Sequence, residues 1–487
     1  MHVKFVVAAE ALFAGYALAV PTATQQTKRQ TGVEEYIASE SPIAYQGVLN
    51  NIGPDGSGAQ GAAADFYTWT RDSGLVFKEL GDAFIAGDAA LEVHLQNYVT
   101  AQAELQKVSN PSGDLETGGL GEPKFHVDMT AFTEEWGRPQ SDGPALRAIA
   151  LITYANHLIG SGQTEQAQNI WPLVQNDIAY VTEWWNKTTF DLWEEVEGSS
   201  FFTAASQHRA LIEANALAAA LGQTCEGCEE QASQVLCFVQ DFWTGSAVNS
   251  NINTQGNNRA GLDANSFVSI IHTFDPEAPC DDVTFQPCSA RSLANHKAVV
   301  DSFREGYGVN QGIEQGVGVA VGRYIEDVYM GGNPWYLCTA AAAEILYDAL
   351  FQWAKIGTLS ITDVSLPFFT DIYESAAVGD YAADSEEYTA ITAAVKEYAD
   401  SFIGVLQKYT PKDGSLAEQF GRDDGTPKSA AHLTWSYASF LTMIARRGGI
   451  VPPTWGAATG NTLPDQCSGA SGKGNYAGPA TVSWPSA

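Results

Sequence analysis

Two adjacent glutamates, Glu194 and Glu195, stand in the sequence DLWEEVEGSSFF at residues 191–202, between Trp193 and a Gly-Ser turn. Charged residues seldom lie in an aromatic setting unless they are paired or take part in chemistry. A carboxyl group beside a tryptophan is partly desolvated, so its pKa rises and it can hold a proton near the working pH. The alternative is that both are loop acids held in salt bridges. A proton donor would also need an ionised partner elsewhere in the chain.

A second acid with similar neighbours is Glu418, in the loop sequence DGSLAEQF at residues 413–420. Taken alone, it is most simply a solvated loop side chain. Taken with Glu194, it completes the pair of carboxyls that hydrolysis of a glycosidic bond with inversion requires. One carboxyl is protonated and the other ionised, and they lie about 6.5–9.5 Å apart with room for a water molecule. The two acids therefore suggest an inverting glycosidase.

Three more segments set charged residues beside an aromatic residue. The candidates are Arg71 and Asp72 near Trp69, Trp136 in the sequence EEWGRPQ, and Arg323, Asp327 and Trp335 in the segment 322–335. Each alone is also consistent with a structural salt bridge, and Asp72 with a helix cap. Three such loops in one chain favour a cleft in which charged side chains hold sugar hydroxyls beside aromatic walls.

Signals for other catalytic chemistry are missing from the sequence. The eight histidines show no HExxH spacing, and there is neither a Gly-x-Ser-x-Gly nucleophile elbow nor a phosphate-binding loop. We therefore expect no metal and no cofactor. His208, His272 and His296 are expected in the core or on the surface.

The composition excludes several classes of partner. The chain has 487 residues and a formal net charge of −32. Such a surface repels phosphate backbones and anionic membranes, so neither nucleic acid nor a membrane is an expected partner. After the N-terminal segment, no stretch approaches the ~20 consecutive apolar residues of a membrane span. A neutral, polyhydroxylated substrate fits this charge, and we expect a monomer.

The N-terminus is typical of a secreted, extracellular protein. Residues 1–20 predict a signal peptide, with a disordered N-terminus as the alternative. Residues 21–29 predict a propeptide that ends in a dibasic site, so that the mature chain begins near Gln30. The sequon Asn186-Lys187-Thr188 predicts N-glycosylation of Asn186, which is consistent with secretion.

Seven cysteines fit an oxidising compartment. Cys225 and Cys228 are spaced as in a redox motif, but a local disulfide suits a secreted, acidic chain better. Cys280 and Cys288 flank a Pro-containing loop that a disulfide would close. Cys338 lies in an apolar, helix-like run and is the candidate for a buried free thiol.

The body of the chain has a helical pattern. Apolar spacing and helix-start signals predict helices over 72–86, 91–108, 142–159, 166–185, 206–221, 231–243, 292–303, 334–356, 364–377, 388–409 and 429–447. The long connections 51–71, 109–141, 186–205, 244–291, 304–333 and 410–428 carry most Trp, Gly, Pro and acidic residues. Long, aromatic-rich loops are more often functional than disordered. This predicts an all-α helical barrel with its site on the loop face, formed by residues 30–452, and a tail, 453–487, that wraps it.

Eight motifs resemble those of fungal glucoamylases in order and spacing. They are YTWTRDSG (67–74), LGEPKF (120–125), WGRPQ (136–140), DGPALR (142–147), DLWEEV (191–196), GSSFF (198–202), NPW (333–335) and LTWSY (433–437). The resemblance covers the chain from about residue 33 to its end. It implies an (α/α)6 barrel that releases β-D-glucose from the non-reducing ends of starch, maltooligosaccharides and related α-1,4-glucans, more slowly at α-1,6 links. Because the chain stops at Ala487, we expect a form without the starch-binding module that some members carry.

The resemblance also implies roles for individual residues. It makes Glu194 the general acid, Glu418 the general base, and Arg71 and Asp72 the clamp on the terminal glucose. Further substrate-binding residues would be Trp136, Leu192, Trp193, Glu195, Arg323, Asp327 and Trp335. The family's cysteine pattern implies the pairs Cys225–Cys228, Cys237–Cys467 and Cys280–Cys288, with Cys338 free.

Two departures from the family pattern bear on activity. The segment 53–66 is shorter than usual, and Asp65 stands where the family has a site tyrosine near the attacking water. Ile325 replaces a usual proline, which is expected to alter only the stiffness of its loop. The alternatives to a glucoamylase are therefore a glucan-binding protein with weak or no turnover and a related exo-glucosidase of different linkage preference.

Overall fold

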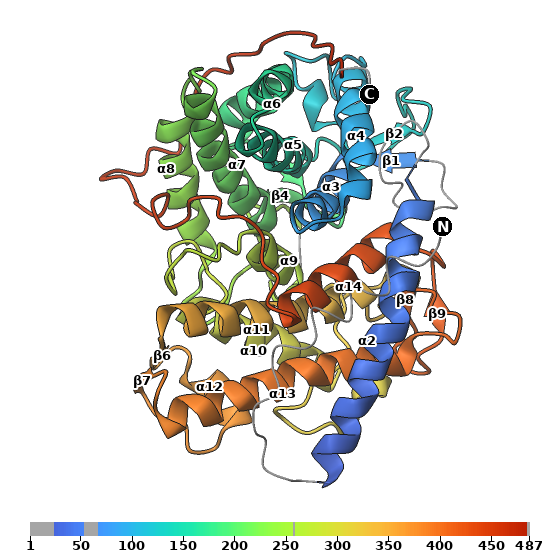
Figure 1. The fold of residues 1–487 in the computed structure, drawn as a ribbon, viewed down its shortest axis with the longest axis vertical. Coiled ribbons are helices and arrows are strands. Elements are labelled where there is room, and N and C mark those ends of the chain that lie inside the picture. The colour runs from blue at the N-terminus through green and yellow to red at the C-terminus, as the bar shows by residue number, and fades with distance from the viewer. Residues whose placement is uncertain (1–23, 53–66, 257–258, 485–487) are drawn as a thin grey trace.

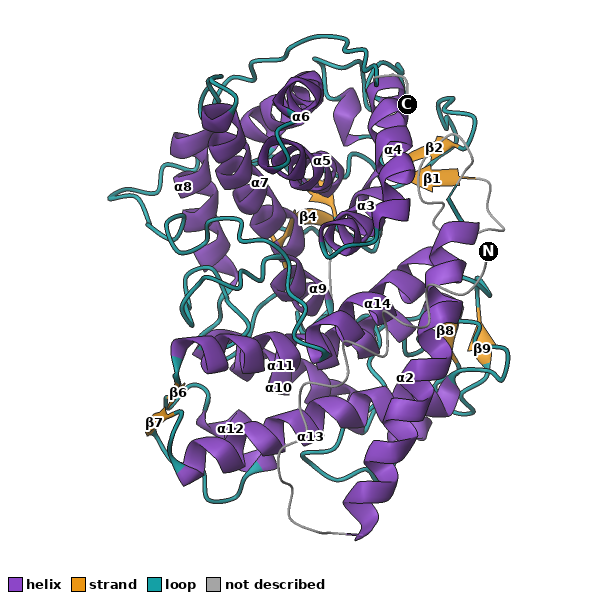
Figure 2. Cartoon of the chain, in the orientation of Figure 1, coloured by secondary structure: helices purple, strands orange, loops and turns teal. Residues whose placement is uncertain are grey.

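The computed structural model describes residues 24–52, 67–256 and 259–484. The predicted signal peptide, the start of the predicted propeptide and the segment 53–66 with Asp65 lie outside the described residues. Helices dominate the described chain, and its strands are short (Figure 2). Within the described ranges, none of the helices combines the length and the apolar character that a membrane crossing requires.

The helices of the described chain form an inner and an outer layer (Figure 1). The inner helices are α3 (Thr70–Ile85), α5 (Asp142–Gly160), α7 (Phe201–Ala220), α9 (Asn265–His272), α11 (Tyr336–Ile356) and α14 (Thr434–Arg447). Each contacts the next, and α14 returns to α3, so the layer closes into a barrel. The outer helices α2 (Thr24–Asn50), α4 (Glu92–Leu105), α6 (Thr164–Trp184), α8 (Cys228–Val239), α10 (Ala290–Arg304) and α13 (Glu386–Tyr409) alternate with them along the chain. The predicted all-α (α/α)6 barrel is therefore confirmed.

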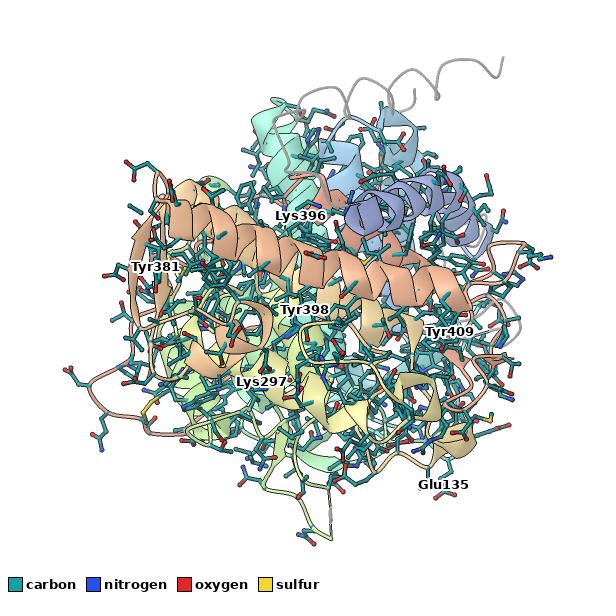
Figure 3. All side chains as sticks on the ribbon, turned by 90° about the horizontal axis from the view of Figure 1, so that it is seen from below. Glu135, Lys297, Tyr381, Lys396, Tyr398 and Tyr409 are labelled. Carbon is teal, nitrogen blue, oxygen red and sulfur yellow. A yellow bond between two sulfur atoms is a disulfide. The ribbon has the colours of Figure 1, made fainter. Side chains whose placement is uncertain are left out.

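The burial of each layer follows from its sequence. α11 is buried almost continuously from Tyr336 to Ala349, including the alanine run 340–343, so it is stable only inside the barrel. α13 instead buries one stripe at helical spacing. On this helix Tyr398 lies on the inner side and Lys396 on the outer side (Figure 3). Outer helices thus shield the inner layer while presenting charged side chains to water.

Short antiparallel strands lie in the connections that precede the inner helices. They are β1 (Tyr67–Trp69) paired with β2 (Lys124–His126), the sheet β3 (Thr189–Phe190), β4 (Glu197–Ser200) and β5 (Asn251–Ile252), and β8 (Gln419–Phe420) paired with β9 (Pro427–Lys428). The pair β6 (Thr358–Ile361) and β7 (Gly379–Ala382) follows the C-terminus of α11 instead. Most of the ordered connections therefore lie at one end of the barrel.

Several helix boundaries differ from the prediction. The sequence did not predict α9, which lies inside the connection 244–291, because its eight residues are too few to show a helical repeat. α14 starts at Thr434 instead of 429, since Ser429 has a φ of 61° and follows β9. The predicted helix 364–377 is realised only as α12 (Leu366–Ile372), and α2 was not predicted.

The chain after α14 contacts three outer helices in turn (Figure 1). Gln234 of α8 donates to Gln466 O, Asn176 of α6 donates to Gly478 O, and Trp484 donates to Gln96 O of α4. A disulfide joins Cys237 on α8 to Cys467 in this segment. Further disulfides join Cys225 to Cys228 and Cys280 to Cys288, and Cys338 is a buried free thiol.

Arg147 on α5 and Asp177 on α6 form a buried two-pronged ion pair between the layers, with Nε–Oδ2 and Nη2–Oδ1 distances of 2.9 and 2.5 Å. Arg147→Gln leaves Asp177 buried without its cation and is expected to lower the free energy of unfolding by about 3–5 kcal/mol. Denaturant unfolding measures this change. As a control, Lys107→Gln breaks an exposed pair with Glu104 and should cost less than about 1 kcal/mol. An equally small effect of Arg147→Gln would contradict the expectation.

Candidate active site

The inner helices begin where the candidate residues gather. α3 carries Arg71 and Asp72 in its first turn, α5 starts with Asp142, and α9 and α11 start just after Asp263 and Trp335. The N-terminus is the positive end of a helix dipole and favours nearby carboxylates. The fold therefore collects acidic side chains at this end of the barrel.

A tight turn between β3 and β4 carries the two adjacent glutamates. Oδ1 of Asp191 accepts the backbone N–H groups of Glu195 at 3.0 Å and Val196 at 3.1 Å. The N–H of Glu194 donates to the carbonyl of Asp191, and Glu194 has a φ of 66°, which is uncommon for a residue with a side chain. Asp191 thus shapes a turn in which the two glutamate side chains bind different partners.

Arg71 holds Glu194 from the side of α3. Its Nη2 donates to Glu194 Oε1 at 2.8 Å, while its Nη1 donates to Gln140 at 2.6 Å and to Asp142 at 3.2 Å. The indole N–H of Trp136 donates to the other oxygen of Glu194. Burial raises the pKa of Glu194, and the charge of Arg71 and these hydrogen bonds oppose the rise without cancelling it. Glu194 can therefore keep a proton with both oxygens oriented.

Three carboxyl groups surround the single guanidinium of Arg71. They belong to Asp72, Asp142 and Glu194, at 3.5, 3.2 and 2.8 Å. Burial raises the pKa of Asp72 to about 6, although the charge of Arg71 opposes the rise. One guanidinium is thus shared among carboxyls from α3, from the start of α5 and from the glutamate turn.

Glu195 lies in the opposite electrostatic situation. Arg323 Nη2 donates to its Oε1 at 2.7 Å, Arg259 Nη2 donates to its Oε2 at 2.5 Å, and the Tyr324 hydroxyl also donates to Oε2. Burial alone would raise the pKa of Glu195, but Arg323, the tyrosine hydrogen bond and Arg259 together bring it below the ordinary value. Glu195 therefore stays ionised beside a glutamate that favours its proton.

A wall of three tryptophans connects the glutamate turn to the second half of the barrel. The ring of Trp193 lies 5.6 Å from that of Trp335 and 6.2 Å from that of Trp435. The indole N–H of Trp193 donates to Asp263 Oδ1 at 2.8 Å. The wall therefore contacts the N-termini of α9, α11 and α14.

Glu418 reaches the same wall through its neighbour. Gln419 pairs with Trp335 in an isolated β-bridge, and Gln419 Nε2 donates to Glu418 Oε2 at 2.8 Å. The hydroxyl of Ser436 in α14 donates to Ala417 O at 2.8 Å. The segment with Glu418 is thus fixed between the starts of α11 and α14, on the wall to which Trp193 belongs.

Lys124 lies in an aromatic cage next to Glu194. Its ammonium nitrogen is 3.7, 4.0, 4.4 and 4.7 Å from the ring centroids of Trp136, Tyr67, Phe132 and Trp69. Cation–π contacts of this kind hold a charge in place beside a partly dry surface. Trp136, at 37 % exposure, forms the outer edge of the cage.

The structure brings most of the predicted residues into one site. Direct contacts link one group, Arg71, Asp72, Trp136 and Glu194, and a second group, Glu195, Arg323 and Asp327. The guanidinium of Arg323 lies 5.6 and 5.2 Å from the ring centroids of Trp193 and Trp335. Glu418 joins through Gln419. Leu192 is 1 % exposed, and its side chain belongs to the same core cluster as Trp193 and Trp335.

Sequence reasoning missed three contributors, Lys124, Arg259 and Tyr324. Lys124 lies in the motif 120–125 and Tyr324 in the segment 322–335, where other residues were the predicted site residues. Arg259 lies in a Gly/Asn-rich loop with no recognisable pattern. Arg259 and Tyr324 bind Glu195 from 64 and 129 positions away, and the cage of Lys124 includes Tyr67 and Trp69 from the preceding strand β1. Within the described ranges, no group of three or more His, Cys, Asp or Glu side chains is arranged to hold a metal ion.

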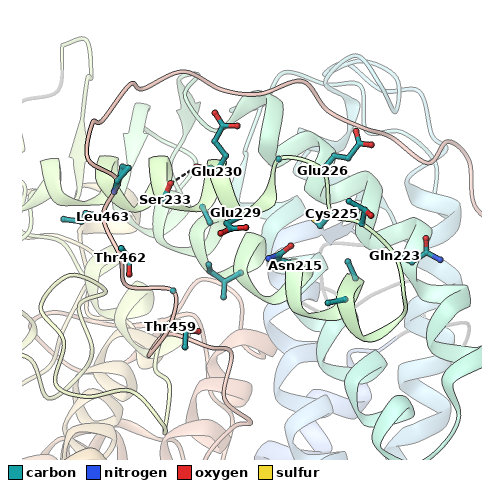
Figure 4. Close-up of a pocket in the computed structure, with 18 residues that line it drawn as sticks. Asn215, Gln223, Cys225, Glu226, Glu229, Glu230, Ser233, Thr459, Thr462 and Leu463 are labelled. Atoms are coloured by element: carbon teal, nitrogen blue, oxygen red, sulfur yellow. Dashed lines mark hydrogen bonds between the residues drawn. The ribbon is translucent and has the colours of Figure 1, made fainter.

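A pocket of about 1020 Å³ lies away from these acids, at the opposite end of α7 (Figure 4). It is lined by the end of α7, the Cys225–Cys228 loop, the start of α8 and residues 459–464. None of the predicted catalytic or sugar-binding residues lines it. The pocket is therefore separate from the candidate site, whose residues lie at the N-terminal ends of the inner helices.

Comparisons with known proteins agree with this geometry. The family model described as glycosyl hydrolases family 15 matches residues 42–445. Glucoamylase-1 of Arthroderma benhamiae is 54 % identical over 90 % of this chain and 74 % of its own length, and the glucoamylase of Neurospora crassa is 53 % identical over 93 % and 74 %. The solved glycoside hydrolase family 15 glucoamylase of Hypocrea jecorina matches with a TM-score of 0.91 and 52 % identity, over 93 % of this chain and 79 % of its own.

Arg71→Gln removes the cation nearest to Glu194 and is expected to raise the pKa of Glu194 further, because burial remains while the opposing charge is lost. NMR titration of ¹³C-labelled glutamate side chains measures the shift. Arg291→Gln is a matched control, since Arg291 belongs to the outer helix α10 and bonds Gln240. An unchanged titration of Glu194 in Arg71→Gln would show that this ion pair does not set its protonation.

Proposed function

The chain belongs to glycosyl hydrolases family 15, and from this premise we propose that Glu194 and Glu418 are the acid and the base with which it hydrolyses α-1,4-glucans. Its activity is that of a glucoamylase, an exo-acting glucan 1,4-alpha-glucosidase, as in relatives that share more than half of its residues. Nothing in these relatives supports a glucan-binding protein without turnover. The proposal concerns which side chains perform the steps.

Glu194 is the general acid. Its buried carboxyl favours the protonated form, and Arg71 and Trp136 orient the two oxygens. In the reaction, the proton passes from Glu194 to the glycosidic oxygen while the bond from that oxygen to the anomeric carbon breaks. The transition state carries positive charge on the sugar ring, and the carboxylate left on Glu194 is stabilised by Arg71. The hydrogen bonds of Arg71 and Trp136 to the two oxygens of Glu194 are the observation that carries this assignment.

Glu418 is the general base. Its Oε2 accepts from Gln419 Nε2, and the bridge between Gln419 and Trp335 ties its segment to the tryptophan wall that also contains Trp193. It takes a proton from a water molecule, whose oxygen attacks the anomeric carbon on the face opposite the departing chain. An α-linked substrate then gives β-D-glucose, because a single displacement inverts the centre.

Two charged clusters hold the terminal sugar between the acids. Arg71 is made rigid by Gln140, Asp142 and Glu194, so that it and Asp72 offer a fixed donor and acceptor to sugar hydroxyls. On the other side, Glu195 and Arg323 form the second clamp. Asp327 binds Arg323 through both oxygens at 2.8 and 2.7 Å, so its role is to position Arg323.

We further propose that the protein is a secreted, glycosylated monomer. The predicted signal peptide, the disulfides and the exposed sequon at Asn186 support export. The boundaries 1–20, 21–29, 30–452 and 453–487 remain predictions. Sequencing the N-terminus of the protein recovered from culture medium would test the first two.

Glu194→Gln and Glu418→Gln are each expected to lower kcat on soluble starch by about 10²- to 10⁴-fold, since each removes one proton transfer while leaving the side-chain shape. Binding of maltooligosaccharide, measured by calorimetry, should persist. Glu197→Gln is the matched control, because Glu197 is an exposed glutamate at the start of β4. Near-normal activity of either catalytic variant would refute its assignment.

The wild-type enzyme is expected to release glucose as the β anomer, which ¹H NMR of the first turnovers detects before mutarotation. Release of the α anomer would contradict the proposed single displacement. Initial rates on maltose and isomaltose, compared in the same assay, test the linkage preference. A faster rate on isomaltose would favour the related exo-glucosidase of different linkage preference.

A further inference from the structure

We propose that Arg259 is a positioning residue for the glucosidase reaction, which locks the carboxylate of Glu195 against Arg323 so that it meets the sugar in one orientation. The inference rests on the proposed contact of Glu195 with substrate. It concerns a residue from a separate loop, between β5 and α9, that lies 64 positions from Glu195. The contacts around this loop carry it.

Arg259 binds the carboxylate oxygen of Glu195 that Arg323 does not bind. Arg323 binds Oε1 of Glu195 through Nη2, and its Nε and Nη2 also bind Asp327. Arg259 Nη2 binds Oε2 at 2.5 Å. Without Arg259, the carboxylate would keep one arginine contact and the Tyr324 hydrogen bond, and rotation about its last bond would be less restricted. Two arginines acting on different oxygens fix the plane of the carboxylate.

Arg259 is itself held in place by the segment that carries Arg323. Its guanidinium lies over the ring of Tyr324, 3.6 Å from the centroid, and its Nη2 donates to the Tyr324 hydroxyl at 2.8 Å. The next residue, Ala260, donates its N–H to Glu326 Oε1 at 2.8 Å, and Asp263 pairs with Tyr324 in a β-bridge. The loop is thus attached to the 322–327 segment at three points.

The other end of the guanidinium faces the turn that carries both glutamates. Arg259 Nη1 lies 3.7 Å from Asp191 Oδ2 and 4.0 Å from Asp263 Oδ2. Asp191 is the residue that shapes the turn, and Asp263 binds the indole of Trp193. Arg259 therefore contacts both the carboxylate of Glu195 and Asp191, the residue that shapes the turn.

The charge of Arg259 also contributes to the difference in pKa between Glu195 and Glu194. The groups that face Glu195 are Arg323, Arg259 and Tyr324, and Asp191 on its own turn adds a further negative charge. Burial works to raise the pKa of Glu195, and these cations and the hydroxyl lower it. Loss of Arg259 removes one of the two cations, so Glu195 would take up its proton at a higher pH than in the wild-type enzyme.

The test compares Arg259→Gln, Arg259→Lys and Glu195→Gln, alone and in the double variant Arg259→Gln/Glu195→Gln, by kcat and KM on maltooligosaccharide across pH. We expect Arg259→Gln to raise KM about 10- to 100-fold with a smaller loss of kcat, as expected for a displaced binding group. The acidic limb of its kcat/KM profile should move to higher pH. Arg259→Lys, which keeps a charge, should restore part of both.

The double variant separates positioning from an independent role. If Arg259 acts through Glu195, the double variant is no worse than Glu195→Gln alone; if the two losses multiply, the inference is overturned. An unshifted acidic limb in Arg259→Gln would also overturn it, because a merely structural role would leave that limb in place. If Arg259→Gln does not fold, the same cycle with Arg259→Lys decides.

Two controls complete the experiment. Arg291→Gln removes another partly buried arginine that lies near an aromatic ring, 5.5 Å from the Trp243 centroid, and should behave as wild type. A Glu195→Gln variant with wild-type KM would show that the proposed substrate contact of Glu195 is wrong. That outcome is distinct from multiplying losses, which would contradict only the role of Arg259.

Discussion

The 2.8 Å ion pair between Arg71 and Glu194 joins the first inner helix to the turn that carries the proposed acid. A charge buried to this degree is stable only when it is paired and hydrogen-bonded. The guanidinium needs carboxyls from its own helix, from the start of α5 and from the turn, and none of these segments offers a complete partner set alone. The geometry of the acid is therefore tied to the closure of the barrel, since the partners meet only when the inner helices are in place.

Glu194 and Glu195 are neighbours in sequence with opposite electrostatic surroundings. Glu194 shares one guanidinium with two other carboxyls, whereas Glu195 is bound by two guanidinium groups and a hydroxyl. The turn separates them at the cost of a positive φ at Glu194, a strain of order 1–3 kcal/mol that the hydrogen bonds to Asp191 offset. Adjacent positions in the sequence thus have opposite pKa shifts, because their burial and their charged and hydrogen-bonding partners differ.

The helical barrel was largely predictable from the sequence because most inner and outer helices are long and strongly patterned. α9 escaped, since eight apolar-rich residues in a long connection have no repeat to detect. Glu194 was suggested by its own neighbours, but Glu418 gained weight only as a partner and through the family resemblance. Its link to the wall depends on a bridge between Gln419 and Trp335, 84 residues apart in number, which no local pattern encodes. Arg259 was missed for the same reason: its function lies wholly in contacts with distant segments.

The bond between Cys237 and Cys467 spans 230 residues and encloses the second half of the barrel, including the segments of Arg259, Arg323 and Glu418. A protease that cuts one exposed loop within this span therefore releases no fragment, because both pieces remain covalently joined at α8. The cut chain would keep its mass on a non-reducing gel and would separate only after reduction. After a single cleavage in this span, the bond therefore keeps the two parts of the barrel close enough to stay associated.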